Sequence, residues 1–544
     1  MSGFPIITVL TFLPLIGGVI VAGVGQENRK LARGLALTFS FLSLALALVM
    51  WKNFDASSGA FQFEERHAWI PSLGVDYRVA VDGLGLLMVM LTAIVVPMAL
   101  LAAGGLFAGG TGSPLAIHRS PLPADGAHGV TRPTNSPLYY ALVLFLQSGL
   151  FGTFTALNFF HWFIFWELSL IPAFFLIRLW GGPRRAAAST QFFVYTMAGS
   201  ITLLLSFLAI FLATHRFDFT ELSKMASRGE LNPALADNLG WKDLTGKQLV
   251  TVIFMGAFLG FAVKVPLIPF HTWLPGAYAE APSSTTMLLT GVMSKMGVYG
   301  FLRILLPIFP EPMRWLRMPL LVLAVVTIVF SAGAAFAQKD LKRILAYSSI
   351  NHLGYCLLGI FAVATPAAGV LAPATEKAAA LNGVFLQMFN QGLTAATLFW
   401  FVSLLEQRSG GLGGLNDFGG VRRVAPVFCG LMGIALFSSL GLPGLNGFIG
   451  EFLIFKGVFP LATCSASLSV IGLLVTAIFI LTILQRVFNG PLNPQWSKLP
   501  DLTPAERVML AAPIALLFAL GLWPQLVLGV INGTVVRMVE QISF

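Results

Sequence analysis

Apolar runs of membrane length follow one another along nearly the whole of this chain. A helix needs about 20 apolar residues to cross a bilayer, and about fourteen such runs can be counted. Only 10% of the residues are charged, against about 25% in soluble domains. The sequence therefore predicts an all-α polytopic membrane protein with about fourteen transmembrane helices. The runs lie at 4–24, 31–52, 83–103, 138–157, 160–180, 188–213, 249–280, 284–306, 318–338, 341–364, 378–404, 427–461, 466–488 and 508–530.

The order of runs and polar segments predicts five parts. These are helices 1–3 in 1–103, a flexible insertion loop rich in Gly, Pro, Ser and Thr in 104–136, helices 4–8 in 137–306, helices 9–13 in 307–490, and helix 14 with a tail in 491–544.

Two polar segments carry patterns of their own. Alternating residues within 53–82 predict a short external hairpin, and 214–248 is polar with one amphipathic portion, also external. The N-terminal run has no basic start and no small-residue cleavage site, so we expect it to remain as the first helix.

The net charge of +10 does not indicate nucleic-acid binding, because Lys and Arg are spread along the loops. Their distribution predicts orientation instead. With an even number of spans, both termini lie on one side of the membrane. An outer N-terminus puts about 17 Lys and Arg inside and about 13 outside. We expect both termini outside, although this modest margin leaves the opposite orientation open.

The three cysteines, Cys356, Cys429 and Cys464, lie in or beside apolar runs and lack metal-ligand spacing. They give no iron–sulfur, haem or zinc signature, and we interpret them as small apolar core residues.

Four ionisable residues sit inside otherwise apolar runs: Glu167, Lys264, Lys295 and Glu451. A charge at the bilayer centre costs roughly 2.5–3.5 kcal/mol, so four cost on the order of 10–14 kcal/mol. That sum is about the whole stability of an ordinary domain. The pattern indicates an ion or proton path through the membrane.

Two of the runs are interrupted next to these residues. The seventh contains Pro266 and Pro269 after Lys264, and each proline frees a backbone carbonyl. The twelfth contains Pro443 among several glycines, followed by Glu451. Freed carbonyls in hydrocarbon must be buried in protein or face a wet cavity. Broken helices in corresponding halves are typical of transport sites.

A short echo relates the two interrupted runs. Residues 260–264 read GFAVK and residues 447–451 read GFIGE. The two runs are five spans apart and therefore cross the membrane in opposite directions, as in an inverted repeat of five helices.

The charged residues can work together or merely pair. A nearby lysine would keep Glu167 ionised, and Lys264 and Lys295 are the available partners. A lysine balanced between burial and a nearby carboxylate can bind and release a proton when its partner moves. A static ion pair is the alternative. His271 and His352 can relay protons through their two ring nitrogens, or they can be packing residues.

These residues lie in strings that resemble the antiporter-like subunits of respiratory complex I, and the resemblance covers nearly the whole chain. Around the twelfth span the sequence is similar to M-type members, which carry Glu where L- and N-type members typically carry Lys. The strings are FWELSLIPAFFLI, FAVKVPLIPFHTWLPGAYAEAPSSTTMLL, GVMSKMGVYGFLR, DLKRILAYSSINHLGY and GLPGLNGFIGEFLIF.

The resemblance implies a fold and a set of roles. Spans four to eight and nine to thirteen would form two inverted five-helix repeats with broken helices 7 and 12. Glu167 would pair with Lys264, Lys295 would be the central relay, and Glu451 would end the outward path. His271 and His352 would bridge these groups along a hydrated axis.

The resemblance also implies the setting. The chain would lie in a bacterial cytoplasmic membrane among lipids, L-type and N-type neighbours and small membrane subunits. NADH, flavin, iron–sulfur clusters and quinone would belong to other subunits, with no cofactor or metal in this one.

Two features depart from the family pattern. Gln391 stands where the family usually has a histidine. An amide can hold a water chain but takes up no proton at physiological pH, so that step would run through water. The 104–136 segment is longer than the family's usual loop, which indicates either a subunit contact or a disordered insertion.

Other functions compete with a proton-pumping complex I subunit. The same fold would suit a subunit of a multisubunit cation/proton antiporter or of a hydrogenase-linked ion pump. A purely structural membrane spacer is a further alternative, which the cost of four buried charges disfavours.

Overall fold

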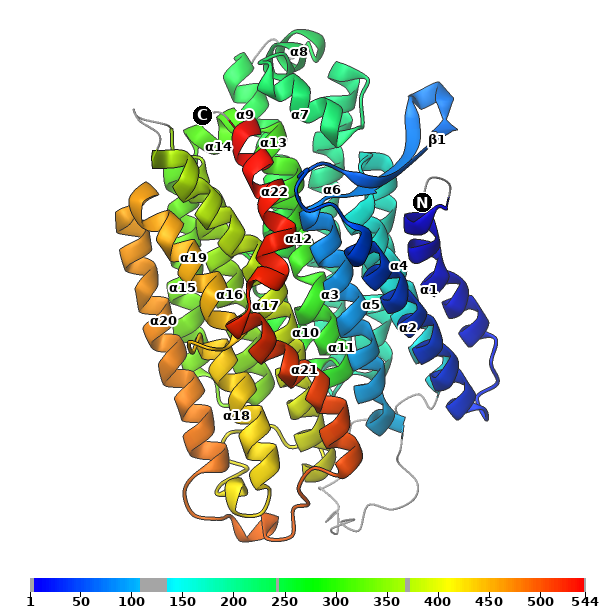
Figure 1. The fold of residues 1–544 in the computed structure, drawn as a ribbon, viewed down its shortest axis with the longest axis vertical. Coiled ribbons are helices and arrows are strands. Elements are labelled where there is room, and N and C mark those ends of the chain that lie inside the picture. The colour runs from blue at the N-terminus through cyan, green and yellow to red at the C-terminus, as the bar shows by residue number, and fades with distance from the viewer. Residues whose placement is uncertain (1–3, 108–134, 241–243, 367–371, 543–544) are drawn as a thin grey trace.

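The computed structural model describes residues 4–107, 135–240, 244–366 and 372–542. Most of these residues form long helices that run roughly along the longest axis of the molecule, and both termini lie at one end (Figure 1). The expected insertion loop, 104–136, falls mainly on residues 108–134, outside the described ranges. We call the end with the termini the terminal face.

The described part of the N-terminal half contains helices α1 to α15 and one hairpin. The elements are α1 (Ile6–Ala22), α2 (Arg29–Asn53), β1 (Gln62–Ile70), β2 (Val75–Val81), α3 (Gly83–Ala102), α4 (Ser136–Thr155), α5 (Phe159–Trp180), α6 (Arg185–Thr214), α7 (Phe219–Ser227), α8 (Leu231–Asn238), α9 (Gly246–Lys264), α10 (Trp273–Glu280), α11 (Ser283–Leu288), α12 (Lys295–Gly300), α13 (Leu306–Ile308), α14 (Pro310–Trp315) and α15 (Arg317–Ala337).

The regular elements that the structure describes in the C-terminal half are helices joined by loops. The elements are α16 (Leu341–Val363), α17 (Ala372–Ser409), α18 (Pro426–Leu440), α19 (Asn446–Leu461), α20 (Thr463–Ile483), α21 (Pro504–Leu522) and α22 (Gln525–Gln541).

The helices agree with the apolar runs. Twelve helices of the described chain are long and apolar enough to cross a membrane, and α1 and α18 are shorter apolar helices. Each of the expected runs overlaps one of these helices, because in hydrocarbon a backbone must satisfy its own polar groups. The protein is therefore a mainly helical membrane protein, while fourteen crossings and inverted repeats stay predictions.

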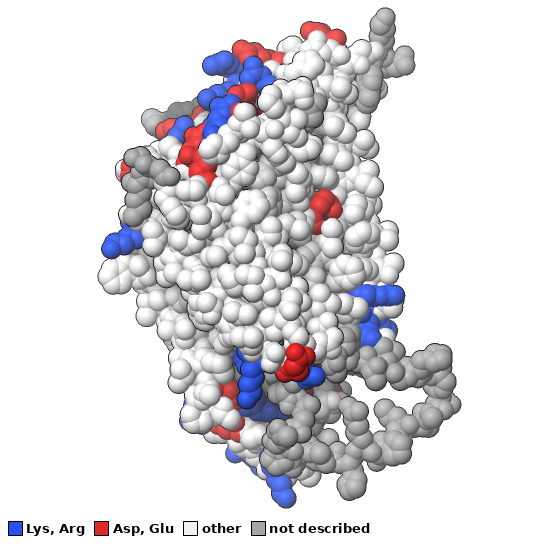
Figure 2. Space-filling model, turned by 90° about the vertical axis from the view of Figure 1, so that its right-hand side faces the viewer, with Lys and Arg blue, Asp and Glu red and all other residues white. Residues whose placement is uncertain are grey.

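Charged side chains gather towards the two ends of the molecule and leave a largely uncharged belt between them (Figure 2). Such a belt is the surface that a bilayer would cover. An acidic side chain nevertheless interrupts the belt on the face that Figure 2 shows.

The hairpin expected in 53–82 is present. Strands β1 and β2 pair antiparallel, and Arg66 forms an ion pair with Asp76 across them at 2.6 Å. The segment 214–248 holds the short helices α7 and α8, which lie at the terminal face with the hairpin (Figure 1).

Both expected helix breaks are present. Helix α9 ends at Lys264, and α10 begins at Trp273; α18 ends at Leu440, and α19 begins at Asn446. The break thus follows Lys264 but precedes Glu451.

The last run, 508–530, is not one helix, contrary to the prediction. It is divided between α21 and α22 at Pro524. A proline pushes the residue before it out of the helical region, and Trp523 accordingly has φ −132° and ψ 66°.

The eighth run forms a continuous helix of 26 residues, Ser283–Ile308. It combines α11, α12 and α13 with two π-helical turns, Leu289–Met293 and Phe301–Leu305. Such turns are rare and occur frequently at functional sites. They lie on either side of Lys295, which begins α12.

Candidate functional site

Glu167 lies in the middle of α5, at the edge of the helix bundle. The residue is partly exposed, and its neighbours Ile164 and Ile171 are exposed apolar side chains. Both carboxylate oxygens are nevertheless buried and have no hydrogen-bond partner among the described residues. A buried carboxylate without hydrogen-bond donors costs free energy. The contacts of Glu167 among the described residues do not offset that cost.

Lys264 is the last residue of α9 and is buried. Its ammonium lies over the ring of Trp166, 4.9 Å from the ring centroid. Trp166 directly precedes Glu167 in the chain. The Glu167 carboxylate acts on Lys264 electrostatically, but the described residues include no direct ion pair between them. The expected contact is therefore replaced by a looser one, in which the indole face holds the cation.

The carbonyls beside Lys264 have found partners. Pro266 has no amide to offer Ala262, whose carbonyl instead accepts from Leu267 N at 2.9 Å. The Val263 carbonyl accepts from the indole Nε1 of Trp273 at 3.0 Å. The break is therefore packed inside the protein, as hydrocarbon demands.

Lys295 is completely buried, and its ammonium is surrounded by oxygen acceptors. These are the Thr290 carbonyl, the Ser294 hydroxyl at 3.3 Å and the side-chain carbonyl of Gln391 on α17. The π-helical turn before α12 holds Thr290. All three contacts are uncharged, so Lys295 has no carboxylate partner among them.

Gln391 links this lysine to helix α16. Its Oε1 accepts from Lys295, and its Nε2 donates to Ser349 Oγ at 3.4 Å. Ser349 Oγ also lies 2.8 Å from Thr290 Oγ1. The amide that departs from the family pattern therefore makes a direct bridge between two buried polar groups.

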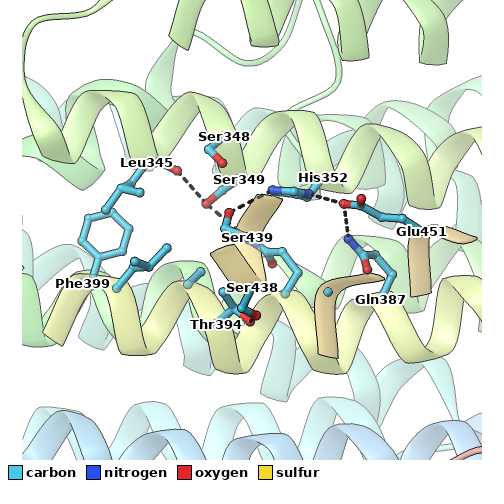
Figure 3. Close-up of a pocket in the computed structure, with 14 residues that line it drawn as sticks. Leu345, Ser348, Ser349, His352, Gln387, Thr394, Phe399, Ser438, Ser439 and Glu451 are labelled. Carbon is cyan, nitrogen blue, oxygen red and sulfur yellow. Dashed lines mark hydrogen bonds and ion pairs between the residues drawn. The ribbon is translucent and has the colours of Figure 1, made fainter. Parts of the chain in front are cut away.

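His352 and Glu451 form a second cluster. His352 Nδ1 lies 2.9 Å from Glu451 Oε1, and Nε2 lies 3.2 Å from Ser439 Oγ. Gln387 donates to the same Glu451 oxygen at 3.2 Å. Figure 3 shows His352 between Ser439 and the Glu451 carboxylate. Four helices, α16, α17, α18 and α19, contribute to the cluster.

A cavity joins the two clusters. It measures about 20 Å³ and is lined by Ser349, His352, Gln391, Ser439 and Glu451 among others. A cavity of about 10–15 Å³ or more with polar partners can hold a water molecule. One water here would connect Gln391 to His352 without a direct side-chain contact.

A smaller cavity lies beside Lys264. It measures about 10 Å³, and Lys264 and Ser294 are part of its lining. Ser294 also accepts a hydrogen bond from Lys295, so the residues around this cavity include Lys264 and a direct neighbour of Lys295. The row from Lys264 to Glu451 is thus made of hydrogen bonds and two small cavities.

His271 stands apart from this row. It is buried in the break between α9 and α10, near the rings of Phe330 and Tyr347. Its Nδ1 is buried and has no hydrogen-bond partner in the described structure. No hydrogen bond or ion pair among the described residues joins it to Lys264 or Lys295, so its relay role stays a prediction.

The second helix break is held by a pair of asparagines. Asn390 Nδ2 donates to the Asn446 carbonyl at 2.6 Å, and Asn446 Nδ2 donates to the Asn390 carbonyl at 3.1 Å. Ser438, near the end of α18, donates to Asn446 Oδ1. These bonds clamp α17, α18 and α19 together after Pro443 and set the position of Glu451, one turn into α19.

Sequence reasoning missed Ser349, Gln387, Ser439 and the two asparagines. Neutral polar residues occur throughout membrane helices and carry no period or motif of their own. One signal was available: α17 carries Gln387, Asn390, Gln391 and Thr394 at helical spacing, which places them on one side of the helix.

Comparisons with known proteins agree with this architecture. A family model described as NADH:quinone oxidoreductase/Mrp antiporter, TM, matches residues 156–479. The NADH-quinone oxidoreductase subunit M of Mycobacterium tuberculosis is 32% identical over 545 residues, covering 98% of this chain and 94% of the relative.

Two solved structures share the fold. A chain of respiratory complex I from Thermus thermophilus with bound NADH has a TM-score of 0.80 at 24% identity, covering 98% of this chain and 99% of that one. A chain of the Mrp complex from Dietzia sp. has a TM-score of 0.80 at 19% identity and is covered completely. The chain therefore belongs to the NADH:quinone oxidoreductase/Mrp antiporter family of transmembrane subunits.

Proposed function

We propose that this chain is the M-type subunit of an NADH:quinone oxidoreductase and translocates protons through the row from Glu167 to Glu451. Redox chemistry in other subunits would drive it. The observation that carries the proposal is the buried row of Lys264, Lys295, Gln391, His352 and Glu451, in which Lys295 bonds Gln391, His352 bonds Glu451, and two small cavities lie beside these residues. An isolated buried ion pair would need no such row.

Each group has a chemical role in this proposal. Lys264 holds a proton over the Trp166 ring while the Glu167 charge is near, and releases it when that charge moves away. Lys295 receives the proton through Ser294. Gln391 orders water in the cavity without taking up the proton itself, because an amide has no accessible pKa. His352 then passes the proton to Glu451, which releases it.

The partial exposure of Glu167 supports a neighbour on that face. The carboxylate oxygens are buried, but the residue lies beside exposed Ile164 and Ile171 at the lipid-facing edge, where ionisable groups are rarely found. We infer that another antiporter-like membrane subunit, of L-type or N-type, or a small membrane subunit covers it. Movement of that neighbour would change the charge that Lys264 senses.

The setting follows from the same proposal. The chain would lie in a bacterial cytoplasmic membrane with both termini on the outer side, and spans four to eight and nine to thirteen would be two inverted repeats. Two broken helices, each with an ionisable residue beside its break, support the repeats. NADH, flavin, iron–sulfur clusters and quinone would be held by other subunits, and this one would have no redox centre.

The test uses the assembled complex in sealed vesicles. Lys264→Ala and Glu167→Gln should each reduce the protons moved per NADH oxidised, while Lys247→Ala on the same helix α9 should not. Lys247 lies over Trp315, 4.6 Å from its ring centroid, outside the row. Unchanged stoichiometry in both row variants would refute the proposal.

Copurification separates the proposal from an exchanger. Subunits with flavin and iron–sulfur clusters should accompany the chain. A set of membrane subunits with no redox partner, together with sodium uptake in place of proton uptake, would instead indicate a cation/proton antiporter.

A further inference from the structure

A third, larger cavity opens at the terminal face. It measures about 320 Å³, and we call it the terminal vestibule. Its lining includes Thr220, Lys224, Arg537, Asp82 and Arg303. Lys224 and Arg537 are exposed, whereas Asp82 and Arg303 are buried. The vestibule therefore leads from an exposed mouth to a buried floor, with room for several water molecules.

A buried ion pair forms the floor of the vestibule. The Arg303 guanidinium pairs with the Asp82 carboxylate, and their side chains are 8% and 5% exposed. Asp82 also accepts from Gly85 N at 3.0 Å and so caps helix α3. The guanidinium packs over the ring of Phe61, 4.9 Å from its centroid. The cation is therefore fixed in place from several sides.

The floor is connected to the central lysine along one helix. Arg303 Nε donates to the Tyr299 hydroxyl at 3.3 Å, and that hydroxyl donates to the Phe154 carbonyl at 3.1 Å. Lys295 lies four residues before Tyr299, and Arg303 four residues after it, so the three follow one side of the helix on successive turns. The rise from Arg303 to Lys295 is about 12 Å.

The vestibule poses a problem for a proton pump. Water would approach to within two turns of Lys295 from the terminal face, by a route that avoids His352 and Glu451. A proton entering or leaving this way would dissipate the gradient. Between the vestibule and Lys295 stand the Arg303–Asp82 pair and Tyr299.

We propose that Arg303, held by Asp82, is an electrostatic plug that closes a second aqueous route between the terminal vestibule and Lys295. A fixed guanidinium repels hydronium, and it stays charged because arginine is not deprotonated in proteins. Asp82 orients the guanidinium and takes no part in transfer. This inference rests on the proposed role of Lys295 as a proton carrier.

The test measures passive proton leak in vesicles that contain the assembled complex, without NADH. An imposed pH gradient should decay at least about tenfold faster in the double variant R303Q/D82N than in the wild type, because the repelling charge is gone. The double variant is used because removing both partners leaves no uncompensated buried charge. D82N alone keeps the cation and should remain tight, as should R303K.

Controls separate the plug from mere structural damage. Lys224→Gln removes an exposed cation from the vestibule mouth and should not leak. A structural ion pair would instead make D82N and the double variant equally leaky. An assembled double variant that stays tight, or a D82N variant that leaks as fast as the double variant, would overturn the proposal.

A second measurement does not depend on the double variant. In a chain whose three native cysteines are replaced by serine, Ser223→Cys, which lines the vestibule, should react with a membrane-impermeant maleimide. The cysteine of Tyr299→Cys, which lies behind Arg303, should not react with this maleimide. Reaction at this position would contradict the proposal that Arg303 closes the route.

These measurements also distinguish this inference from the proposed function. Normal NADH-driven pumping in Lys295→Ala would refute the relay, whereas the leak is measured without turnover.

Discussion

Replacing Gln391 with leucine removes the one side-chain amide that bridges Lys295 and Ser349. Leucine has a similar size and fills the site, but it offers no acceptor to the buried ammonium. Lys295 then keeps the Thr290 carbonyl and the Ser294 hydroxyl. The cavity wall at this position also becomes apolar, so a water molecule there loses a partner.

The magnitude follows from the type of bond that is lost. A hydrogen bond to a charged group contributes about 1.5–3 kcal/mol, and about 1.4 kcal/mol corresponds to a tenfold change. If the charged form of Lys295 is an intermediate in transfer, Gln391→Leu should slow proton uptake on the order of tenfold to a hundredfold.

The assay reconstitutes the purified complex in vesicles and follows NADH oxidation and proton uptake together. Gln391→His retains a polar side chain and should keep most of the wild-type rate. Asn382→Leu is a matched control on the same helix α17. It loses an amide–amide bond of 3.0 Å to Asn532, away from the relay, and should pump normally. An assembled Gln391→Leu complex with the wild-type rate of proton uptake would refute the reasoning.

Three further predictions concern other parts of the chain. Glu451→Gln keeps the shape of the group beside His352 but removes a carboxylate that can bind and release a proton, so NADH-driven proton uptake should be lost. Lys456→Gln changes an exposed residue on the same helix and should behave as wild type. Gly447→Ala would place a Cβ 1.9 Å from the Ser438 carbonyl oxygen, and such overpacking costs about 1–3 kcal/mol or more. The assembled complex should therefore melt at a lower temperature. Gly430→Ala, whose Cβ meets no atom within 4 Å, should leave the melting temperature unchanged. Partial burial acts to raise the pKa of Asp501, but the backbone N–H groups of Leu502, Phe428 and Val427 outweigh it and hold that pKa below the usual 3.8. A carboxyl whose pKa is lowered by folding stabilises the folded state above its unfolded pKa, and this stabilisation is lost as the pH falls. The wild type should therefore melt at a higher temperature than Asp501→Asn at neutral pH, and the difference in melting temperature should shrink below pH 3.8. A difference in melting temperature independent of pH would contradict this.

The apolar runs predicted the fold well because a bilayer leaves a chain few choices. Every backbone group in hydrocarbon must be bonded within the protein, so each long apolar run became helical, as one helix or as two. The helix breaks were predictable for a local reason, since Pro266 and Pro443 lack amides. The same rule, not applied to Pro524, would have divided the run 508–530 into α21 and α22.

The candidate site was only partly predictable. Glu167, Lys264, Lys295 and Glu451 stood out because charge inside an apolar run is costly. Their contacts did not follow from that cost. Lys264 lies over Trp166 in place of a direct ion pair with Glu167, and Lys295 is held by three uncharged oxygens from two helices.

The sequence by itself determined that this chain is a membrane helix bundle and which ionisable residues lie within it, because hydrophobic length and buried charge are local properties. The tertiary structure decided which of those residues meet. Gln391, which in the sequence stood out as a missing histidine, proved to be a bridge between Lys295 and Ser349. Such a bridge depends on three helices that pack together, with Lys295 and Gln391 96 residues apart in the chain, and no local pattern encodes that packing.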